Sequence, residues 1–379
     1  MSWDRVIGQA RVKKLLTQIL LSGKIPGAFL FEGPDGVGKD ALAIELAKTL
    51  NCERGGSVSC EECASCKQAA ALRHPNIRLV FPLPRGENET KEDGPLDKLD
   101  EKTIQRIREE LSLKAQDPYH RISVPKAQVI KISSIREVIR EDSLSLYQRG
   151  YRVVLIMQAE EVGTEAANAL LKVLEEPGGR TVFILTTSKR SSLLPTMISR
   201  CQLLRFGLLS EDEIAAALIS KHGIKQSDAK LKARLAGGSY GKAVDLLGTD
   251  TLELREEALE LLREIATRNY SQIAYRGRKA LESRDTTRTA TLLNMLQIWL
   301  RDATLTHAGL KKEVINQDKI DVLEKMVNSF DGSQLVYASS CIDAAISQIR
   351  GNVNLGLLFV NLLVNLSGLL NKKMKIEHV

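Results

Sequence analysis

The segment Gly27–Asp40, GAFLFEGPDGVGKD, decides the fold of this chain. It opens with a short apolar run that ends at Glu32, which is typical of a buried parallel strand. Gly33–Lys39 then fits the phosphate-loop spacing G-x-x-x-x-G-K, and Ala41–Leu50 continues with leucines at helical spacing. A strand, a glycine-rich loop and a helix in this order predict a parallel α/β domain whose loop N–H groups can converge on phosphate.

The last position of this motif is unusual. Asp40 replaces the Ser or Thr whose hydroxyl normally ligates Mg²⁺. A carboxylate could hold a metal ion, but its charge would also repel the phosphates. We therefore expect a degenerate phosphate loop that binds ATP weakly or not at all. Its candidate binding residues are Gly33, Gly36, Gly38, Lys39 and Asp40.

Further apolar runs continue the alternation of strands and helices. The clearest strand is Arg152–Met157 (RVVLIM), and the helical segment Ala166–Glu175 follows it. The other expected strands are Asn76–Phe81, Val129–Ile132 and Thr181–Thr187. No strand pattern follows Phe206, so we predict a parallel sheet with helices on both faces over residues 1–206.

The strand Arg152–Met157 does not end as the corresponding strand of an active NTPase would. That mechanism needs one carboxylate to hold the metal and a second group to orient the attacking water. Met157 and Gln158 stand at these places. A thioether coordinates Mg²⁺ poorly, and an amide cannot act as a base. Glu160 and Glu161 lie beyond the expected end of the strand.

A charged insertion, residues 82–125, interrupts the sheet domain. It holds ten acidic and eight basic residues and five prolines, so we expect an exposed segment that is ordered only in part. One amphipathic helix is expected within it, at Leu99–Ala115. After Phe206 nearly everything has helical period, which predicts a small helical domain at 207–248 and a larger all-helical domain at 249–379.

The composition is globular and basic. The 379 residues are 43% hydrophobic and 27% charged, which excludes a wholly disordered or collagenous chain. A net charge of +7 permits contact with nucleic acid or acidic proteins but establishes neither. Val353–Leu370 is the most apolar stretch, but Asn354, Asn361 and Asn365 interrupt it, which favours a buried helix over a membrane span. With no signal-peptide pattern after Met1, we expect a cytoplasmic protein without membrane contact.

Four of the six cysteines are clustered, with the spacing Cys52-x7-Cys60-x2-Cys63-x2-Cys66. In a chain that is not secreted, such a cluster indicates metal ligands before disulfides. Four thiolates suit a closed tetrahedral zinc site, and an iron–sulfur cluster is the alternative. The metal would be structural, because four protein ligands leave no coordination position open for chemistry.

Together, these features resemble the bacterial clamp-loader AAA+ family. The phosphate loop and the cysteine cluster occur in the family's order, followed by Ala166–Pro177 (AANALLKVLEEP) and Ser199-Arg200-Cys201. The last two strings are highly specific to this family. The resemblance is firm over residues 1–206 and weaker in the helical remainder. It implies that 207–248 is a helical lid domain and 249–379 an oligomerisation collar.

Two kinds of family member compete, an ATPase motor and a similar subunit that has lost ATP catalysis. Aligned on Asn168–Glu176, the motor's Asp-Glu pair falls on Met157 and Gln158, and its sensor arginine falls on Gly241, with Lys242 beside it. Counting Asp40 in the phosphate loop, this chain lacks the functional side chains of ATP hydrolysis at three separate sites. We therefore expect the inactive kind, with an active motor as the alternative.

The resemblance also implies roles and partners. Arg200 would be an arginine finger that acts in trans on nucleotide bound to a neighbouring motor subunit; the alternative is an ion pair at a strand edge. The chain would join gamma/tau motor subunits and a delta subunit within a bacterial DNA polymerase holoenzyme. That assembly loads the sliding clamp on primed DNA in replication, so contact with clamp and DNA would be through the complex. A collar would present an apolar face including Leu292, Leu296, Trp299 and Leu300; a bundle packed within the chain is the alternative.

Overall fold

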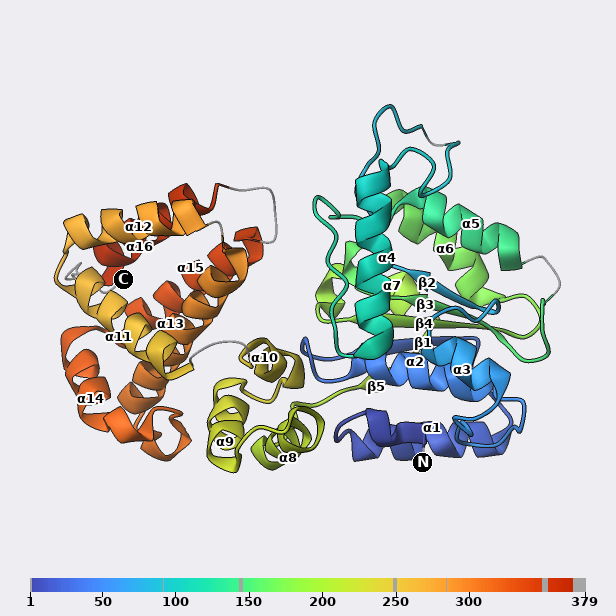
Figure 1. Ribbon diagram of the computed structural model, residues 1–379, viewed down its shortest axis with the longest axis horizontal. Coiled ribbons are helices and arrows are strands. Elements are labelled where there is room, and N and C mark those ends of the chain that lie inside the picture. The colour runs from blue at the N-terminus through green and yellow to red at the C-terminus, as the bar shows by residue number, and fades with distance from the viewer. Residues whose placement is uncertain are drawn as a thin grey trace, which may run out of the picture. The chain divides into compact units, whose positions relative to one another are not determined.

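The computed structural model describes residues 2–90, 92–142, 146–247, 251–283, 285–349 and 354–370. The chain divides into two compact units, Met1–Ala243 and Val244–Val379. The first contains the sheet and its surrounding helices, and the second is helical throughout its described residues (Figure 1). The predicted boundary at 248/249 lies outside the described residues.

The first unit is built on a five-stranded sheet in the order β2-β3-β4-β1-β5, with every neighbouring pair parallel. The apolar run after Gly27 forms β1, the strand that leads into the phosphate loop, and its first four residues, Ala28–Phe31, are all buried. The strands are β1 (Ala28–Glu32), β2 (Ile77–Val80), β3 (Arg152–Ile156), β4 (Thr181–Thr187) and β5 (Gln202–Arg205).

Four of these strands confirm the sequence prediction, and two differences appear. The strand expected at Val129–Ile132 is wrong: only isolated bridges form there, from Val129 to Leu83 and from Ile130 to Val162, and helix α5 begins at Ile132. Strand β5 was not predicted. Its burial is mixed, with Gln202 and Arg205 exposed at the sheet edge, so it lacks the continuous apolar run of a central strand.

Helices cover both faces of the sheet, as predicted (Figure 1). One face packs on α5, α6 and α7, in a core that includes Leu30, Ile135, Leu170 and Phe183. The opposite face carries α1, α2 and α3. The helices are α1 (Ala10–Ser22), α2 (Lys39–Leu50), α3 (Ala64–Ala70), α4 (Glu101–Gln116), α5 (Ile132–Asp142), α6 (Thr164–Glu175) and α7 (Pro195–Ile198), with 3₁₀ turns η1 (Ser2–Arg5), η2 (Ala159–Glu161) and η3 (Arg190–Ser192).

The insertion is not simply exposed, and that prediction is wrong for its second half. Its helix is present as α4, and Ile107, Glu110 and Lys114 of this helix are buried. In the segment that follows α4, Tyr119 and Ile122 are also buried. Charged residues of this segment, such as Glu110 and Lys114, form ion pairs with other residues of the first unit. A high count of charged residues therefore did not mean that the segment is exposed.

Three helices follow the sheet, and local signals set both ends of the first of them. They are α8 (Glu211–His222), α9 (Gln226–Leu235) and α10 (Tyr240–Asp245). Ser210 and Glu213 form a reciprocal capping box at the start of α8, and Gly223 ends it in a left-handed conformation with φ 66°. The helical pattern predicted after Phe206 is therefore confirmed in these three helices.

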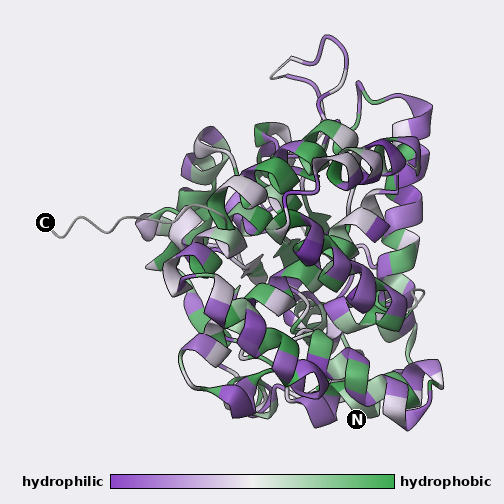
Figure 2. Ribbon diagram, turned by 90° about the vertical axis from the view of Figure 1, so that its left-hand side faces the viewer, coloured by the Kyte–Doolittle hydropathy of each residue, from purple (hydrophilic) through white to green (hydrophobic). Residues whose placement is uncertain are grey.

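The second unit is a helical bundle around α13, which packs against α11, α14 and α15. Leu292, Leu296, Trp299 and Leu300 of α13 are buried inside this unit, so the alternative of packing within the chain holds for them. Hydrophilic and hydrophobic residues alternate along the helical ribbons (Figure 2). The elements are α11 (Thr251–Ala266), α12 (Tyr270–Ser283), α13 (Thr286–His307), η4 (Lys311–Glu313), η5 (Gln317–Lys319), α14 (Ile320–Ser329), α15 (Gly332–Ile349) and α16 (Leu355–Leu370).

The apolar C-terminal stretch forms α16, and eight of its residues, among them Phe359 and Leu363, are buried. Across the described residues, no helix combines the length and apolar character needed to cross a membrane.

Candidate functional site

The phosphate loop connects β1 to α2 and keeps the shape that its sequence predicts. Gly36 and Gly38 have φ of 74° and 103°, a region that side chains other than glycine rarely adopt. A Cβ on Gly38 would also lie 2.8 Å from the Tyr119 hydroxyl. The loop therefore requires these glycines, and a residue of the insertion closes tightly over it.

Lys39 is turned onto its own loop. Its Nζ donates hydrogen bonds to the carbonyl oxygens of Gly33, at 2.7 Å, and of Pro34, at 2.6 Å. Burial lowers the pKa of Lys39, and the nearby carboxylates of Asp40 and Asp35 offset part of this effect. The ammonium group that would meet a phosphate in an active loop is engaged by carbonyl oxygens instead.

Asp40, at the position of the missing hydroxyl, is held by two other side chains. Lys114 Nζ, from α4, donates to Asp40 Oδ2 at 2.9 Å, and the Thr186 hydroxyl donates to Oδ1 at 2.7 Å. Burial alone would raise the pKa of Asp40, but the charge and hydrogen bond of Lys114, with the bond from Thr186, hold this pKa below its usual value. The carboxylate is thus neutralised by a protein cation.

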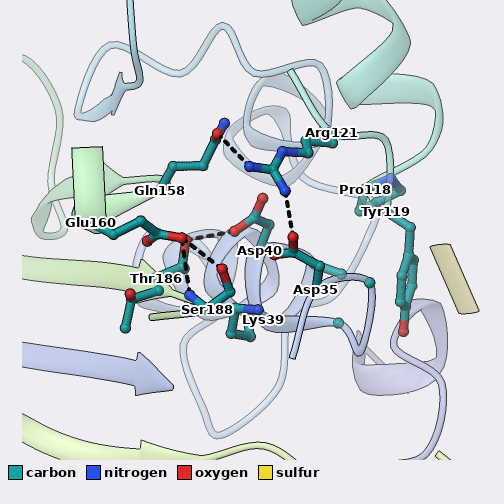
Figure 3. Close-up of a pocket in the computed structure, with 14 residues that line it drawn as sticks. Asp35, Lys39, Asp40, Pro118, Tyr119, Arg121, Gln158, Glu160, Thr186 and Ser188 are labelled. Atoms are coloured by element: carbon teal, nitrogen blue, oxygen red, sulfur yellow. Dashed lines mark hydrogen bonds and ion pairs between the residues drawn. The ribbon is translucent and has the colours of Figure 1, made fainter. Parts of the chain in front are cut away.

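A second cation from the insertion spans the mouth of the loop. Arg121 donates to Asp35 Oδ2 at 2.5 Å and to Gln158 Oε1 at 2.9 Å (Figure 3). Gln158 follows β3 in a left-handed conformation and does line the pocket, whereas Met157 is 1% exposed and does not. Of the two positions where an active site needs acidic groups, one is therefore an amide bound to arginine and the other is part of the core.

Glu160 is nevertheless brought to the pocket. Turn η2 carries it back toward β4, where its Oε1 accepts hydrogen bonds from the Ser188 backbone N–H at 3.2 Å and hydroxyl at 2.7 Å. Its Oε2 is buried without a hydrogen bond. The sequence placed Glu160 beyond the expected end of the strand and did not predict that it would line the pocket.

The pocket that these residues line is small. Its volume is about 60 Å³, and Pro118, Tyr119 and Arg121 of the insertion form part of its wall. Pockets that hold drug-sized ligands are typically ~300–1,000 Å³. The side chains around this loop therefore leave little free space beside it.

Arg200 lies near the amino ends of the strands, opposite the carboxyl ends where the phosphate loop begins. The loop follows the carboxyl end of β1, whereas Arg200 precedes β5, whose first residue Gln202 pairs with Phe29 near the amino end of β1. The length of β1, at ~3.3 Å per residue, separates the two sites by roughly 15 Å. Arg200 cannot serve the pocket of its own chain.

The surroundings of Arg200 are open. Its Nε and Nη2 donate to Glu175 Oε2 at 3.1 and 2.7 Å, and its Nη1 donates to the Thr196 carbonyl at 3.0 Å. The neighbouring hollow has a volume of about 390 Å³ and is lined in part by Gly27, Pro177 and Ser199. The strand-edge ion pair considered as an alternative is therefore present in the isolated chain.

The four clustered cysteines meet in space. Their Sγ atoms all lie within 4.8 Å of one another, and Cys60 Sγ is 3.9 Å from Cys66 Sγ. A tetrahedral ion with bonds of ~2.3 Å to sulfur needs sulfur atoms about 3.8 Å apart, so the cluster fits and could hold a metal ion. The Cys63 and Glu62 backbone N–H groups lower the pKa of the Cys60 thiol to about 6, which favours the thiolate that a metal needs.

This cluster is fastened to the helix that follows the phosphate loop. Lys48 of α2 is fully buried between Glu45, at 2.6 Å, and Glu61, at 2.7 Å, and Glu61 lies in the turn between Cys60 and Cys63. The turn is therefore anchored by an ion pair as well as by its sulfur atoms.

Family comparisons divide the chain in a way that parallels its two units. Residues 8–210 match the family described as "DNA polymerase III, delta subunit", and residues 250–368 match "DNA polymerase III, delta subunit, C terminal".

Individual relatives carry related names. "DNA polymerase III subunit delta'" of Bacillus subtilis is 27% identical, over 91% of this chain and 92% of its own length. The Escherichia coli protein of the same name is 27% identical, over 83% and 80%. "DNA polymerase III subunit gamma" of Buchnera aphidicola is 29% identical, over 65% and 57%. Among solved structures, a Thermotoga maritima gamma subunit-related protein matches with a TM-score of 0.42 and 17% identity, over 94% of this chain and 99% of that chain.

Proposed function

This chain belongs to the DNA polymerase III delta subunit family, and we propose that it is a clamp-loader subunit of the delta-prime type. It would help to load the sliding clamp on primed DNA during replication without hydrolysing ATP itself. Its proposed partners are the gamma/tau motor subunits and a delta subunit, with the clamp and DNA contacted through the assembled complex in the cytoplasm.

The observation that carries this proposal is the pairing of Asp40 with Lys114. The position that should help to bind Mg²⁺ is a carboxylate already neutralised by a buried ammonium group. Lys39 and Gln158 are likewise engaged within the protein. A pocket in this state supports a role that does not depend on its own hydrolysis of ATP.

Arg200 is proposed to act on a neighbouring subunit. Its place at the sheet edge away from its own phosphate loop supports action in trans, since a guanidinium there can stabilise charge only on a phosphate held by another chain. Glu175 would have to release it on assembly. The Glu175 ion pair lies at the surface, where such pairs contribute little, so exchanging it for a contact with another subunit would cost little free energy.

The cysteine cluster is proposed to hold zinc in a structural role. Four sulfur ligands with no open position support this choice, and the iron–sulfur alternative differs in absorbing visible light and in containing sulfide. The predicted lid, 207–248, and collar, 249–379, are likewise proposals for the helical parts of the chain.

An active motor of the gamma/tau type is the weaker alternative. Relatives named gamma or gamma/tau match 65–69% of this chain, against 91% for the Bacillus subtilis delta' protein. The two functions separate in an ATPase assay of the purified chain with Mg²⁺ and primed DNA. We expect no turnover above background, and turnover that disappears on Lys39→Ala would overturn the proposal.

A further inference from the structure

We propose that residues 110–122 of the insertion are an internal ligand of the phosphate-loop pocket: Lys114 and Arg121 take the places of bound cation and nucleotide, and hold the pocket closed without either. This inference deepens the proposed function, since it rests on a subunit that works without its own nucleotide. The sequence alone left this segment without a role.

Lys114 is the cation of this internal ligand. It reaches the loop from the last turn of α4, and its side chain is only 1% exposed. Besides Asp40, its Nζ has one further recorded partner, the carbonyl oxygen of His120, at 2.7 Å. A buried ammonium persists only when such partners surround it, so Lys114 and Asp40 require each other.

Arg121 is the part that closes the mouth. Its two bonds join Asp35, in the phosphate loop, to Gln158, beyond β3, and the Gln158 amide in turn donates to the Ile122 carbonyl at 3.3 Å. Figure 3 shows the guanidinium lying between these two side chains. The loop is thereby connected to a second strand through protein atoms alone.

The segment is rigidly attached to α4. Glu110 is 1% exposed, and its Oε2 accepts from the Ser123 N–H at 2.9 Å and lies 2.8 Å from His120 Nε2. Its Oε1 pairs with Arg106 at 2.7 Å. These contacts fix the turn that carries Arg121, so the arginine is presented in one geometry and not from a free loop.

The same segment also contacts the helices that follow the sheet. The Tyr119 hydroxyl accepts from the Ile7 N–H at 2.8 Å, and its ring packs edge-on against Tyr240 of α10, with centroids 4.8 Å apart. Lys221 of α8 lies 5.4 Å from the centre of each ring. Ser239, just before α10, donates to the Asp35 carbonyl at 2.8 Å. The segment thus joins the loop, the N-terminus, α8 and α10, which makes a closed pocket its resting state.

The test is hydrogen exchange of the full chain, read on peptides covering 33–42. In the natural chain we expect slow exchange that 1 mM Mg-ATP leaves unchanged. Arg121→Gln should speed exchange of these peptides at least about tenfold, because it removes the bridge to Gln158. The matched control is Arg108→Gln, on the exposed side of α4, where the side chain is 73% exposed; it should leave exchange unchanged. Equal exchange in Arg121→Gln and the natural chain, or protection of the natural chain by Mg-ATP, would overturn the proposal.

A second pair of variants removes dependence on one substitution. Lys114→Met removes the cation that binds Asp40 and should speed exchange of the loop, and Lys114→Met combined with Asp40→Asn removes both partners and should leave exchange fast. If the double variant recovers the slow exchange of the natural chain, the unpaired charge alone had opened the loop, packing and not the pair holds it closed, and the internal-ligand role is wrong. Neither result measures ATP hydrolysis, so this test and the ATPase assay of the proposed function can fail independently.

Discussion

Arg200 directs two donors, Nε at 3.1 Å and Nη2 at 2.7 Å, at one oxygen of Glu175, although both side chains lie at the protein surface. The guanidinium is therefore already paired in the isolated chain. We predict that Arg200→Ala leaves the free energy of unfolding within about 1 kcal/mol of the natural chain, because exposed ion pairs contribute little. In a reconstituted complex with motor subunits it should lower DNA-stimulated ATPase by at least ~10³-fold at the neighbouring site.

The control for this prediction lies on β5, the strand that follows Arg200. Arg205 at the far end of β5 is 72% exposed, and its recorded partner is Glu32 at 3.6 Å. Arg205→Ala should leave the ATPase of the complex unchanged, and Arg200→Lys should recover only part of it, since an ammonium lacks the planar fork. Full activity in Arg200→Ala complexes of normal composition would contradict the role in trans.

The Asp40–Lys114 pair should make the stability of the first unit depend on acid. The pKa of Asp40 is held below its usual value of 3.8, so the pair contributes fully above pH ~4 and is lost as pH falls through the lower folded pKa. Lys114→Met should cost about 3–5 kcal/mol near pH 7, because an unpaired carboxylate remains. Urea unfolding at pH 7 and pH 3 measures both: the cost of Lys114→Met should be smaller at pH 3.

Much of the sheet could be predicted because buried parallel strands are locally apolar. The runs that became β1, β3 and β4 are almost entirely buried, and each was found from its own residues. Strand β5 was missed because Gln202 and Arg205 face solvent at an edge. Val129–Ile132 misled for the opposite reason: it is apolar, but Val129 is 48% exposed and the chain turns directly into α5.

The candidate site could be predicted only where its signal is local. The phosphate loop and the four cysteines declare themselves by spacing. Lys114 and Arg121 have no such signal, because their aspartates lie 74 and 86 residues away in the sequence, respectively. Both also stand among the many other charged residues of the insertion, which gives neither of them a distinguishing pattern. Thr186 could not be predicted as a site residue either, because the hydroxyl that reaches Asp40 lies within the apolar run that forms β4.

The cysteine cluster predicts one bound metal ion per chain. Metal analysis of freshly purified protein should give about one zinc, and Cys60→Ser should release it, because Cys60 is the thiol whose loop N–H groups favour the thiolate. Cys201→Ser is the matched control, since burial raises the pKa of that thiol to about 12 and it lies outside the cluster. A metal content far below one, or visible absorption with acid-labile sulfide, would reject the zinc site.

Asp302 predicts how the helical unit is held together. It is fully buried on α13, and its Oδ2 accepts from the backbone N–H groups of Ile315 and Asn316 at 3.0 and 2.8 Å and from the Asn316 side-chain amide at 2.8 Å. Asp302→Ala would leave these donors buried without a partner, at a cost of about 3–5 kcal/mol. Asp302→Asn keeps the shape but loses the charge and should cost less.

Trp299, one helical turn before Asp302, supplies the measurement. It is 1% exposed, and its indole N–H donates to the Arg255 carbonyl at 3.2 Å, so its fluorescence follows unfolding of this unit. With Trp3 replaced by Phe to remove the other indole, the fluorescence midpoint in urea should fall for Asp302→Ala, and fall less for Asp302→Asn. The Asp40–Lys114 variants should leave this midpoint unchanged, because their contacts lie in the first unit. A midpoint that does not move in Asp302→Ala would mean that the loop between α13 and α14 reorganises to satisfy its own donors.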